Sequence, residues 1–233
     1  MKRPNHILAS LREETRQRLA GELKEVAFSD AAVLYEPGSQ IEHVYFPETA
    51  VISIIQVMQE GTAAEVGMVG CEGISGLEAV LRDGTPTARS VCQVPGTSLM
   101  MPARALRRVA KDSDDLMRAL LDYTGGYCAM LAQLIACNRL HRVEQRCARW
   151  LLMTYDRTGR LSFPMTQERL SVMLGAGRPT VTSTIAALRD AGCLTNGRGQ
   201  VRIQDLKCLE SFACECYRLC ASYFSFDAAK PGA

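Results

Sequence analysis

The sequence lacks the long apolar segments on which membrane and exported proteins depend. No run of about 18 uncharged apolar residues occurs. The N-terminal segment leads into the charged stretch Arg12-Glu13-Glu14 rather than into the apolar core of a signal peptide. Ten cysteines at irregular spacing, without an export signal, favour reduced thiols over a disulfide scaffold. We therefore predict a cytoplasmic protein that does not bind membranes and has no disulfides.

The motifs of common enzyme classes are also missing. Histidine occurs only at His6, His43 and His141, without a His-x-His pair, so a metal-dependent enzyme built on a β-barrel is not predicted. No P-loop, dinucleotide-binding fingerprint or nucleophile elbow is present, and the glycines of residues 67–76 are typical of turns. We predict a protein that is not an enzyme and has no metal site.

Charge is distributed unevenly along the chain, although the net charge is only +2. Residues 1–138 carry 13 Lys/Arg against 17 Asp/Glu, residues 139–202 carry 11 against 4, and residues 203–233 carry 3 against 4. All eleven bases of the middle block are arginines, whose forked guanidinium suits phosphate and guanine. The middle block is therefore a candidate nucleic-acid-binding region, and a solvated basic surface is the alternative.

Short β-branched runs separated by turn residues dominate the first half of the chain. Breaks such as Glu36-Pro37-Gly38 and Val94-Pro95-Gly96 recur every ten to fifteen residues, which is the rhythm of a β-sandwich or jelly roll. The predicted strands lie at 32–35, 44–46, 51–55, 65–69 and 90–94. We predict an all-β first domain with a short helix near 10–23 in front of it.

A long helix is predicted from Ser113, a plausible N-cap, to Asn138. Gly125-Gly126 in its middle indicates close packing or a flexible point, since each glycine costs roughly 1 kcal/mol relative to alanine. Two apolar stripes run along it at spacings of three and four residues, which favours one partner in the same chain and a second copy of the helix in a homodimer. A helix buried in a monomeric core is the alternative. The first stripe is 116, 120, 123, 127, 130, 134 and 137, and the second is 117, 121, 124, 128, 131 and 135.

A helix-turn-helix is predicted over about residues 166 to 190. Thr166 begins a first short helix as its N-cap, Gly175-Ala176-Gly177 forms the turn, and a second helix runs over 178–188 with Pro179 in its first turn. Val181, Ile185 and Leu188 share the inner face of the second helix. The residues left on the outer face, which could enter a DNA major groove, are Arg178, Pro179, Thr180, Thr182 and Ser183.

A hairpin with a basic tip follows the helix-turn-helix. Residues 193–195 and 200–203 read as strands, and Asn196-Gly197-Arg198-Gly199 forms the turn between them. Such a hairpin is typical of the wing of a DNA-binding domain, with Arg198 in position to hold a phosphate. An accessory helical hairpin of an enzyme is the alternative.

The order of these parts resembles the cyclic-AMP receptor/FNR (Crp/Fnr) family of bacterial transcription regulators, most strongly over 143–152 and 166–188. The resemblance implies an α+β chain with an N-terminal cyclic-nucleotide-binding-like β-roll sensor, a long dimerisation helix and a C-terminal winged helix-turn-helix. It also implies RNA polymerase as a partner, and phosphate contacts from Thr166 and Gln167. The base-reading Arg of the family is kept as Arg178, but Pro179 and Ser183 replace its Glu and second Arg. The family's DNA site preference is therefore not carried over.

The sensor only partly matches relatives that bind cyclic AMP, which use a Gly-Glu pair for the ribose and an Arg-Ser pair for the phosphate. Gly76-Leu77 stands where Gly-Glu is expected, so the carboxylate is absent or displaced to Glu72 or Glu78. Arg89-Ser90 matches the phosphate pair and could hold an anion. Leu131-Ala132 stands where hydroxyls would meet adenine. We expect a different nucleotide, a small anion or no effector rather than cyclic AMP, and a cyclic-nucleotide-responsive regulator is the alternative.

A thiol or iron-sulfur sensor is the other option within the family. No cysteine precedes Cys71, which counts against an N-terminal cluster. The tail offers Cys208, Cys214, Cys216 and Cys220 in a segment that reads as helical, where Cys214 would point about 200° away from Cys216. The three last thiols could then not share a metal ion without unwinding, and we interpret them as small core residues.

We therefore predict a regulator that binds double-stranded DNA as a homodimer on a palindromic site. The domains are predicted at 1–112 for the sensor, 113–138 for the dimerisation helix and 139–233 for the DNA-binding domain. The rival from another class is a protein-interaction module, whose binding would lack the steep salt dependence of DNA binding.

Overall fold

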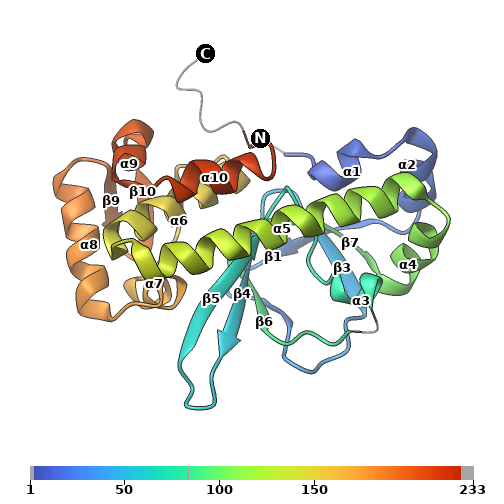
Figure 1. The fold of residues 1–233 in the computed structure, drawn as a ribbon, viewed down its shortest axis with the longest axis horizontal. Helices are drawn as coiled ribbons and strands as arrows, with labels where there is room; N and C mark the ends of the chain where they lie inside the picture. The colour runs from blue at the N-terminus through green and yellow to red at the C-terminus, as the bar shows by residue number, and fades with distance from the viewer. Residues whose placement is uncertain (1–2, 83, 227–233) are drawn as a thin grey trace. The chain divides into compact units, whose positions relative to one another are not determined.

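The structure is a computed structural model that describes residues 3–82 and 84–226 (Figure 1). The chain forms two compact units, and each takes two stretches of the sequence. The first unit comprises residues 1–57 and 66–125, and the second comprises residues 58–65 and 126–233. The chain passes between them at Gly125 and Gly126, inside the long helix, and again at the tip of a β-hairpin. None of the described helices is long and apolar enough to cross a membrane.

Among the residues that the structure describes, seven strands in two antiparallel sheets form most of the first unit. One sheet has the order β1-β7-β3 and the other β2-β6-β4-β5. The predicted jelly-roll class is confirmed, and so are the five predicted strands. The strands are β1 (Lys24–Phe28), β2 (Val33–Tyr35), β3 (His43–Pro47), β4 (Val51–Val57), β5 (Ala63–Val69), β6 (Arg89–Val94) and β7 (Gly96–Pro102).

Strands β1 and β7 were not predicted, because their sequences do not alternate cleanly. Lys24 and Glu25 open β1 with two charges, and β7 contains two consecutive methionines. The two strands pair with each other from Lys24↔Met100 to Phe28↔Gly96. Gly96 is required at the corner, since a Cβ there would lie 2.4 Å from the backbone carbon of Thr49. Pairing between distant segments therefore creates these strands rather than local pattern.

In the described part of this unit, four short helices accompany the sheets. The predicted helix near 10–23 is two helices, α1 (His6–Ser10) and α2 (Glu13–Ala20), separated by Leu11 in an extended conformation. The others are α3 (Glu78–Leu81) and α4 (Ala103–Lys111). Buried Asn5 caps α1 by accepting from the backbone N of Leu8, and its amide donates to the carbonyl oxygens of Pro47 and Gly73. This amide therefore fixes α1 to the β-roll.

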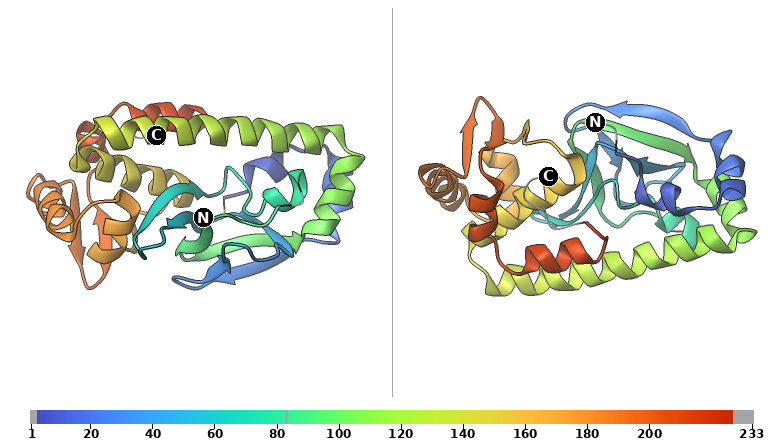
Figure 2. Two further views of the ribbon diagram at one scale, coloured as in Figure 1. Left: turned by 60° about the horizontal axis from the view of Figure 1, so that its bottom comes forward. Right: turned by 90° about the horizontal axis from the view of Figure 1, so that it is seen from above.

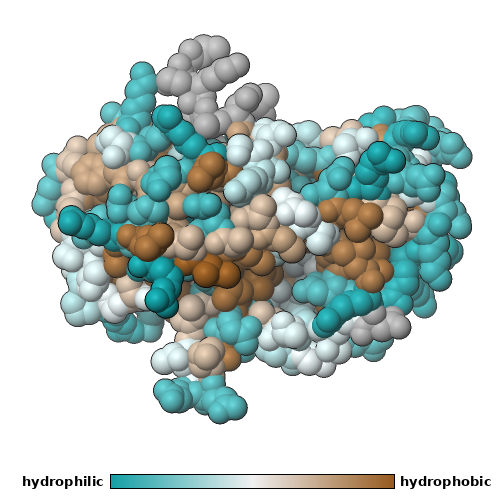
Figure 3. Space-filling model, viewed as in Figure 1, coloured by the Kyte–Doolittle hydropathy of each residue, from teal (hydrophilic) through white to brown (hydrophobic). Residues whose placement is uncertain are grey.

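The long helix α5 (Asp114–Leu140) has 27 residues and extends beyond the predicted end at Asn138. Its first apolar stripe is buried within the chain except at half-buried Tyr127, with Leu116, Leu120 and Met130 at 0% exposure. The neighbouring stripe is half-buried or exposed, and Figure 3 shows apolar side chains over this helix. A Cβ on Gly126 would lie 3.2 Å from the Phe224 ring, whereas one on Gly125 would meet nothing. The glycine pair is thus close-packed on one side only.

Within the described residues, the second unit consists of five helices and a three-stranded sheet of order β8-β10-β9, together with the C-terminal part of α5. Figure 2 shows α10 beside the C-terminal half of α5. The indole Nε1 of buried Trp150 donates to Oε1 of Glu65 (2.9 Å), which lies in β5 close to the tip of the β4–β5 hairpin. The remaining elements are α6 (Val143–Thr158), β8 (Ser162–Pro164), α7 (Gln167–Leu174), α8 (Arg178–Asp190), β9 (Leu194–Gly197), β10 (Gln200–Ile203), α9 (Leu206–Phe212) and α10 (Cys216–Ser222).

Two expectations about the cysteines are wrong. Cys193 and Cys208 form a disulfide, with their Cα atoms 5.2 Å apart, because the chain folds α9 back against the start of β9. The tail is not one helix, since α9 ends at Phe212 and α10 begins at Cys216. Ala213 between them is extended (φ −73°, ψ 151°), so the helical geometry expected for Cys214 and Cys216 does not apply.

Candidate nucleic-acid interface

Helices α7 and α8 and the tight turn between them match the predicted helix-turn-helix. Thr166 caps α7 by accepting from the backbone N of Arg169 (3.2 Å). Gly175 ends α7 in the left-handed region (φ +54°), which suits a residue without a Cβ. Gly177 is the N-cap of α8, and Pro179 stands in its first turn, where its missing N–H costs no hydrogen bond.

The two faces of α8 differ as the sequence predicts. Val181, Ile185 and Leu188 are buried, and Thr184 joins them. The side chains of the opposite face are small except for Arg178, so a nucleic-acid backbone and its base edges could approach closely. All five predicted residues are exposed there: Arg178, Pro179, Thr180, Thr182 and Ser183.

Polar contacts join the exposed side of α7 to the start of α8. Glu168 forms an ion pair with the Arg178 guanidinium, and both side chains are about two-thirds exposed (71% and 66%). Thr182 Oγ1 lies 3.0 Å from Gln167 Oε1, to which it can donate, and it also lies 2.9 Å from the Arg178 carbonyl oxygen. An exposed ion pair is worth only about 0–1 kcal/mol, so a guanine or a phosphate could take Arg178 from Glu168 at small cost.

The wing is a tight hairpin of β9 and β10, as predicted. Its tip residues Arg198 (φ +51°) and Gly199 (φ +75°) both have positive φ, which is the type I′ pattern that matches strand twist. The backbone N of Met165 donates to Gly199 O (2.7 Å) and so ties the tip to the residue before Thr166. The predicted phosphate-binding residues Thr166, Gln167 and Arg198 are therefore near one another in the chain fold, and all are exposed.

The basic surface of the structure is smaller than the number of arginines in the sequence suggests. Three of the eleven arginines in 139–202 are buried, namely Arg146, Arg149 and Arg157. The Arg157 guanidinium lies over the Phe226 ring, 5.4 Å from its centroid, and donates to the Met153 carbonyl oxygen. The count of bases therefore overstates the charge available to DNA, although Arg178, Arg189, Arg198 and Arg202 remain exposed.

Comparison with known proteins identifies both halves of the chain. The model of the Crp-like helix-turn-helix domain matches residues 145–212. The model of the cyclic nucleotide-binding domain matches residues 25–113. The chain belongs to the Crp/Fnr family of transcription regulators. A search of curated protein sequences finds no significant match for this Crp/Fnr protein.

Solved structures share the fold of this Crp/Fnr protein at low sequence identity. FixK2 from Bradyrhizobium japonicum is 16% identical, with a TM-score of 0.68 over 82% of this chain and 98% of its own. A CRP/FNR-family regulator from Thermus thermophilus is 22% identical (TM-score 0.66, 82% and 98%). The c-di-GMP-responsive regulator CLP from Xanthomonas campestris is 13% identical (TM-score 0.67, 83% and 100%). At these identities the likeness concerns the fold.

The first unit of this Crp/Fnr protein holds the residues predicted to bind an effector. Arg89, at the start of β6, donates twice to the Glu36 carboxylate (2.8 and 2.7 Å). These hydrogen bonds lower the pKa of Glu36 and raise the pKa of Arg89. The guanidinium that would hold a phosphate is thus paired with a carboxylate, and because this pair is partly exposed, an anion could take Arg89 from Glu36 at small cost, as at Arg178.

The other predicted effector residues differ from Arg89 in burial and in the contacts that they make. Ser90 is buried and pairs with Tyr35 in the sheet. Glu72 is buried and accepts from the backbone N of Gly70 (3.2 Å). Glu78 is exposed at the start of α3. A carboxylate is therefore present near the expected position in sequence, buried at Glu72 and exposed at Glu78.

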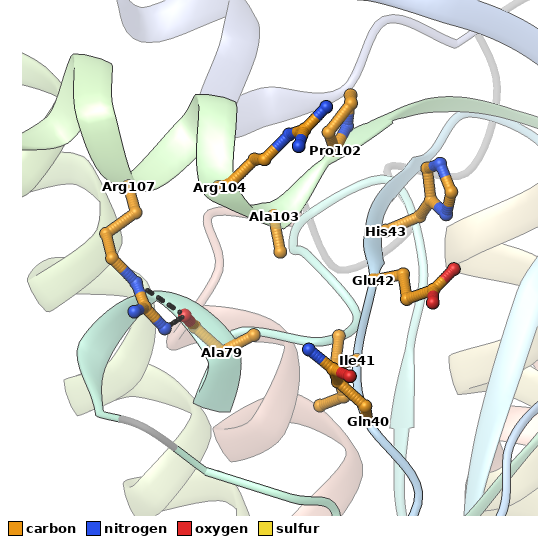
Figure 4. A pocket seen from close by; sticks show the side chains of 9 residues that line it. All are labelled: Gln40, Ile41, Glu42, His43, Ala79, Pro102, Ala103, Arg104 and Arg107. Atoms are coloured by element: carbon orange, nitrogen blue, oxygen red, sulfur yellow. Dashed lines mark hydrogen bonds between the residues drawn. The ribbon is translucent and has the colours of Figure 1, made fainter.

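A pocket of about 520 Å³ lies elsewhere in the first unit (Figure 4). Arg107 borders it, with a guanidinium that donates to the Ala79 carbonyl oxygen (Nε to O, 3.0 Å). Neither Arg89 nor the other predicted effector residues contribute to its lining. The lining residues are Gln40, Ile41, Glu42, His43, Ala79, Pro102, Ala103, Arg104 and Arg107.

Sequence reasoning missed Glu168, the residue that controls the charge next to Arg178. It lies ten positions before Arg178, and an acidic side chain in the first turn of a helix usually reads as favourable interaction with the helix dipole. The turn at 175–177 brings it to the start of α8. Its signal in the sequence is a lone acid in the otherwise basic stretch 157–189.

Proposed function

We propose that this chain is a homodimeric, sequence-specific regulator that binds a palindromic DNA site in the cytoplasm and is not an enzyme. One observation carries the proposal: the exposed outer face of α8, through Thr182, and the wing tip, through Gly199, are both joined to the start of α7. Arg178 would read a base by donating twice to a guanine. Thr180, Thr182 and Ser183 would add shorter contacts, and Thr166, Gln167 and Arg198 would hold phosphates.

The proposal of a homodimer rests on the second stripe of α5. Leu121 is 54% exposed and Ile135 is 68% exposed, which is unusual for large apolar side chains on one helix. Their separation of two heptads places them on one face, with exposed Cys128 midway between them. Two such helices in parallel would bury this stripe, and their two-fold axis would place the reading heads in successive major grooves about 34 Å apart.

We propose that cyclic AMP is not the effector. Leu77 stands in place of the carboxylate that would bind a ribose, and the phosphate-binding arginine, Arg89, is held by Glu36. A different nucleotide or a small anion would have to displace Glu36 to use Arg89-Ser90. RNA polymerase is proposed as a partner on the ground of family membership alone.

The experiment that tests this function is selection of bound duplexes from a random DNA pool by the purified protein, without effector. Enrichment of a palindrome is expected, together with affinity that falls steeply as salt rises because neutralised phosphates release counterions. Light scattering of the free protein should give the mass of two chains. Binding to protein partners without salt-sensitive DNA binding would overturn the proposal in favour of an interaction module.

A further inference from the structure

Four side chains that can ligate a metal converge in the second unit, outside the reading head. They are Cys137 and His141 at the C-terminal end of α5, and Cys214 and Cys216 at the break between α9 and α10. Their sulfur and nitrogen atoms all lie within 4.8 Å of one another. We propose that these four residues bind one Zn²⁺ ion in a closed Cys₃His site.

Local backbone structure explains the convergence. Cys137 and His141 stand one helical turn apart, and the backbone N of His141 donates to the Cys137 carbonyl oxygen (3.0 Å). On the other side, Ala213 ends α9 in an extended conformation, and α10 starts at Cys216. A continuous helix would have turned Cys214 away from Cys216. The break therefore lets Cys214 and Cys216 both face Cys137 and His141, although Cys137 and Cys214 are 77 positions apart in the sequence.

The distances suit a single tetrahedral ion. Cys137 Sγ and Cys214 Sγ are 3.5 Å apart, and Cys216 Sγ and His141 Nδ1 are also 3.5 Å apart. With Zn–S of about 2.3 Å and Zn–N of about 2.1 Å, the edges of a tetrahedral site measure roughly 3.6–3.8 Å. An iron-sulfur cluster places several irons and sulfides between its thiolates and needs a wider set. Three thiolates and one imidazole are also a common donor set of structural zinc sites.

The groups around the four ligands already have the arrangement that metal sites need. His141 directs Nδ1 toward Cys216, while its Nε2 lies 3.3 Å from Glu215 Oε1. A carboxylate on the second ring nitrogen fixes the tautomer and the orientation of a metal-binding histidine. Gln133 Nε2 donates to Cys216 Sγ (3.1 Å), as amides commonly do to metal-bound thiolates.

Two buried arginines provide independent support. Arg146 and Arg149 are at most 9% exposed, and in both the Nε atom has no hydrogen-bond partner. Within residues 3–82 and 84–226, neither forms a salt bridge with a carboxylate. Both act electrostatically on Cys137. Isolated buried charges are costly, and a Zn²⁺ ion with three thiolates carries a net single negative charge that would compensate them.

Such an ion would fasten the tail to the point where α5 meets α6. Cys137 and His141 end the long helix, whereas Cys214 and Cys216 join the last two helices, so a single ion would link segments that no described disulfide connects. The four protein ligands would fill all four coordination positions of the ion, which leaves none open for a substrate. The role is therefore structural, and it does not depend on the proposed DNA binding.

The test measures metal in the full-length protein, purified with reductant and without chelators. We expect elemental mass spectrometry to find one zinc ion per chain. Replacement by Co²⁺ should give the intense sulfur-to-cobalt and ligand-field absorption of a tetrahedral thiolate site. Cys214→Ala and Cys216→Ala should each reduce zinc content at least tenfold at a fixed competing chelator concentration. Cys220→Ala is the matched control, since it removes an equally buried thiol one turn further along α10, and it should keep one equivalent.

His141→Cys keeps the proposal testable if the alanine variants fail to fold. This variant should retain the ion and shift the cobalt spectrum toward that of four thiolates, which a purely packing role of His141 would not produce. Absence of stoichiometric zinc or cobalt in the folded, reduced protein would overturn the proposal. A Cys137–Cys214 disulfide found by peptide mapping of that preparation would overturn it as well.

Discussion

The reading head, residues 166–203, and the β-roll of the first unit differ in how they present the residues expected to bind. In the reading head every predicted contact residue is exposed, and the fold brings both helices and the wing to one place. In the β-roll Arg89 is paired with Glu36, and Glu72 and Ser90 are buried. Both Arg178 and Arg89 are paired with a carboxylate, so the comparison teaches that burial of the other predicted residues is what separates the two regions.

The largest expected effect concerns the exposed apolar face of α5, through which we propose that two chains pair. Ile135→Glu should shift the protein to monomers, because the charge would be buried against its symmetry mate. The affinity for a palindromic site should fall about 100-fold or more, since the second half-site would no longer bind intramolecularly. Sedimentation measures the shift to monomers, and DNA titration measures the loss of affinity. Met58→Glu, at another exposed apolar residue, should change neither.

Arg178→Ala should cost roughly 1–3 kcal/mol on the selected site, which is about 5-fold to 150-fold, and less on random DNA. Competition titration on both duplexes measures the difference. Arg189→Ala, at the opposite end of α8, is the control with the same charge change. An equal loss on both duplexes would make Arg178 a phosphate contact rather than a base-reading residue.

Arg198→Asn should weaken binding on every sequence and reduce the slope of log affinity against log salt by about 0.9, the value for one phosphate contact. Asparagine tolerates the positive φ of position 198, so the hairpin should persist. An unchanged salt slope would show that the wing tip does not touch the DNA backbone.

Glu168→Gln should strengthen DNA binding by a few-fold. The substitution removes a negative charge beside the phosphates and releases Arg178, while the amide keeps the size of the side chain. The gain should disappear in the double variant with Arg178→Ala if release of the arginine is its cause. If the gain in affinity is equally large with and without Arg178, its cause is the removal of the negative charge of Glu168 alone.

The smallest effect is expected in the β-roll. Arg89→Ala should leave apo DNA binding unchanged and lower the melting temperature only slightly, because the Arg89–Glu36 pair is exposed. The pKa of Glu36 is lowered in the folded protein, so the pair stabilises above the unfolded carboxyl pKa and loses its effect as pH falls through the folded value. The difference in melting temperature between variant and parent should therefore vanish in acid. A difference that grows in acid would contradict this sign.

The sequence predicts those parts whose structure depends on local pattern. The helix-turn-helix follows from the cap at Thr166, the glycine turn and the spacing of Val181, Ile185 and Leu188, which all lie close together in the chain. The strand β1 and the helix break at Ala213 depend on distant partners instead. The same holds for the Cys193–Cys208 disulfide, whose members are related by folding rather than by spacing. Three buried arginines show that charge counts miss burial.

Trp150 is the one tryptophan of the chain, and it gives the molecule its own optical reporter. Its indole is buried on α6 and donates to Glu65 on the hairpin that extends from the β-roll. Indole emission responds to the polarity and hydrogen bonding around the ring. A ligand that moved this hairpin would therefore shift the tryptophan emission maximum of the native protein. Effectors could be screened by this shift without any attached dye.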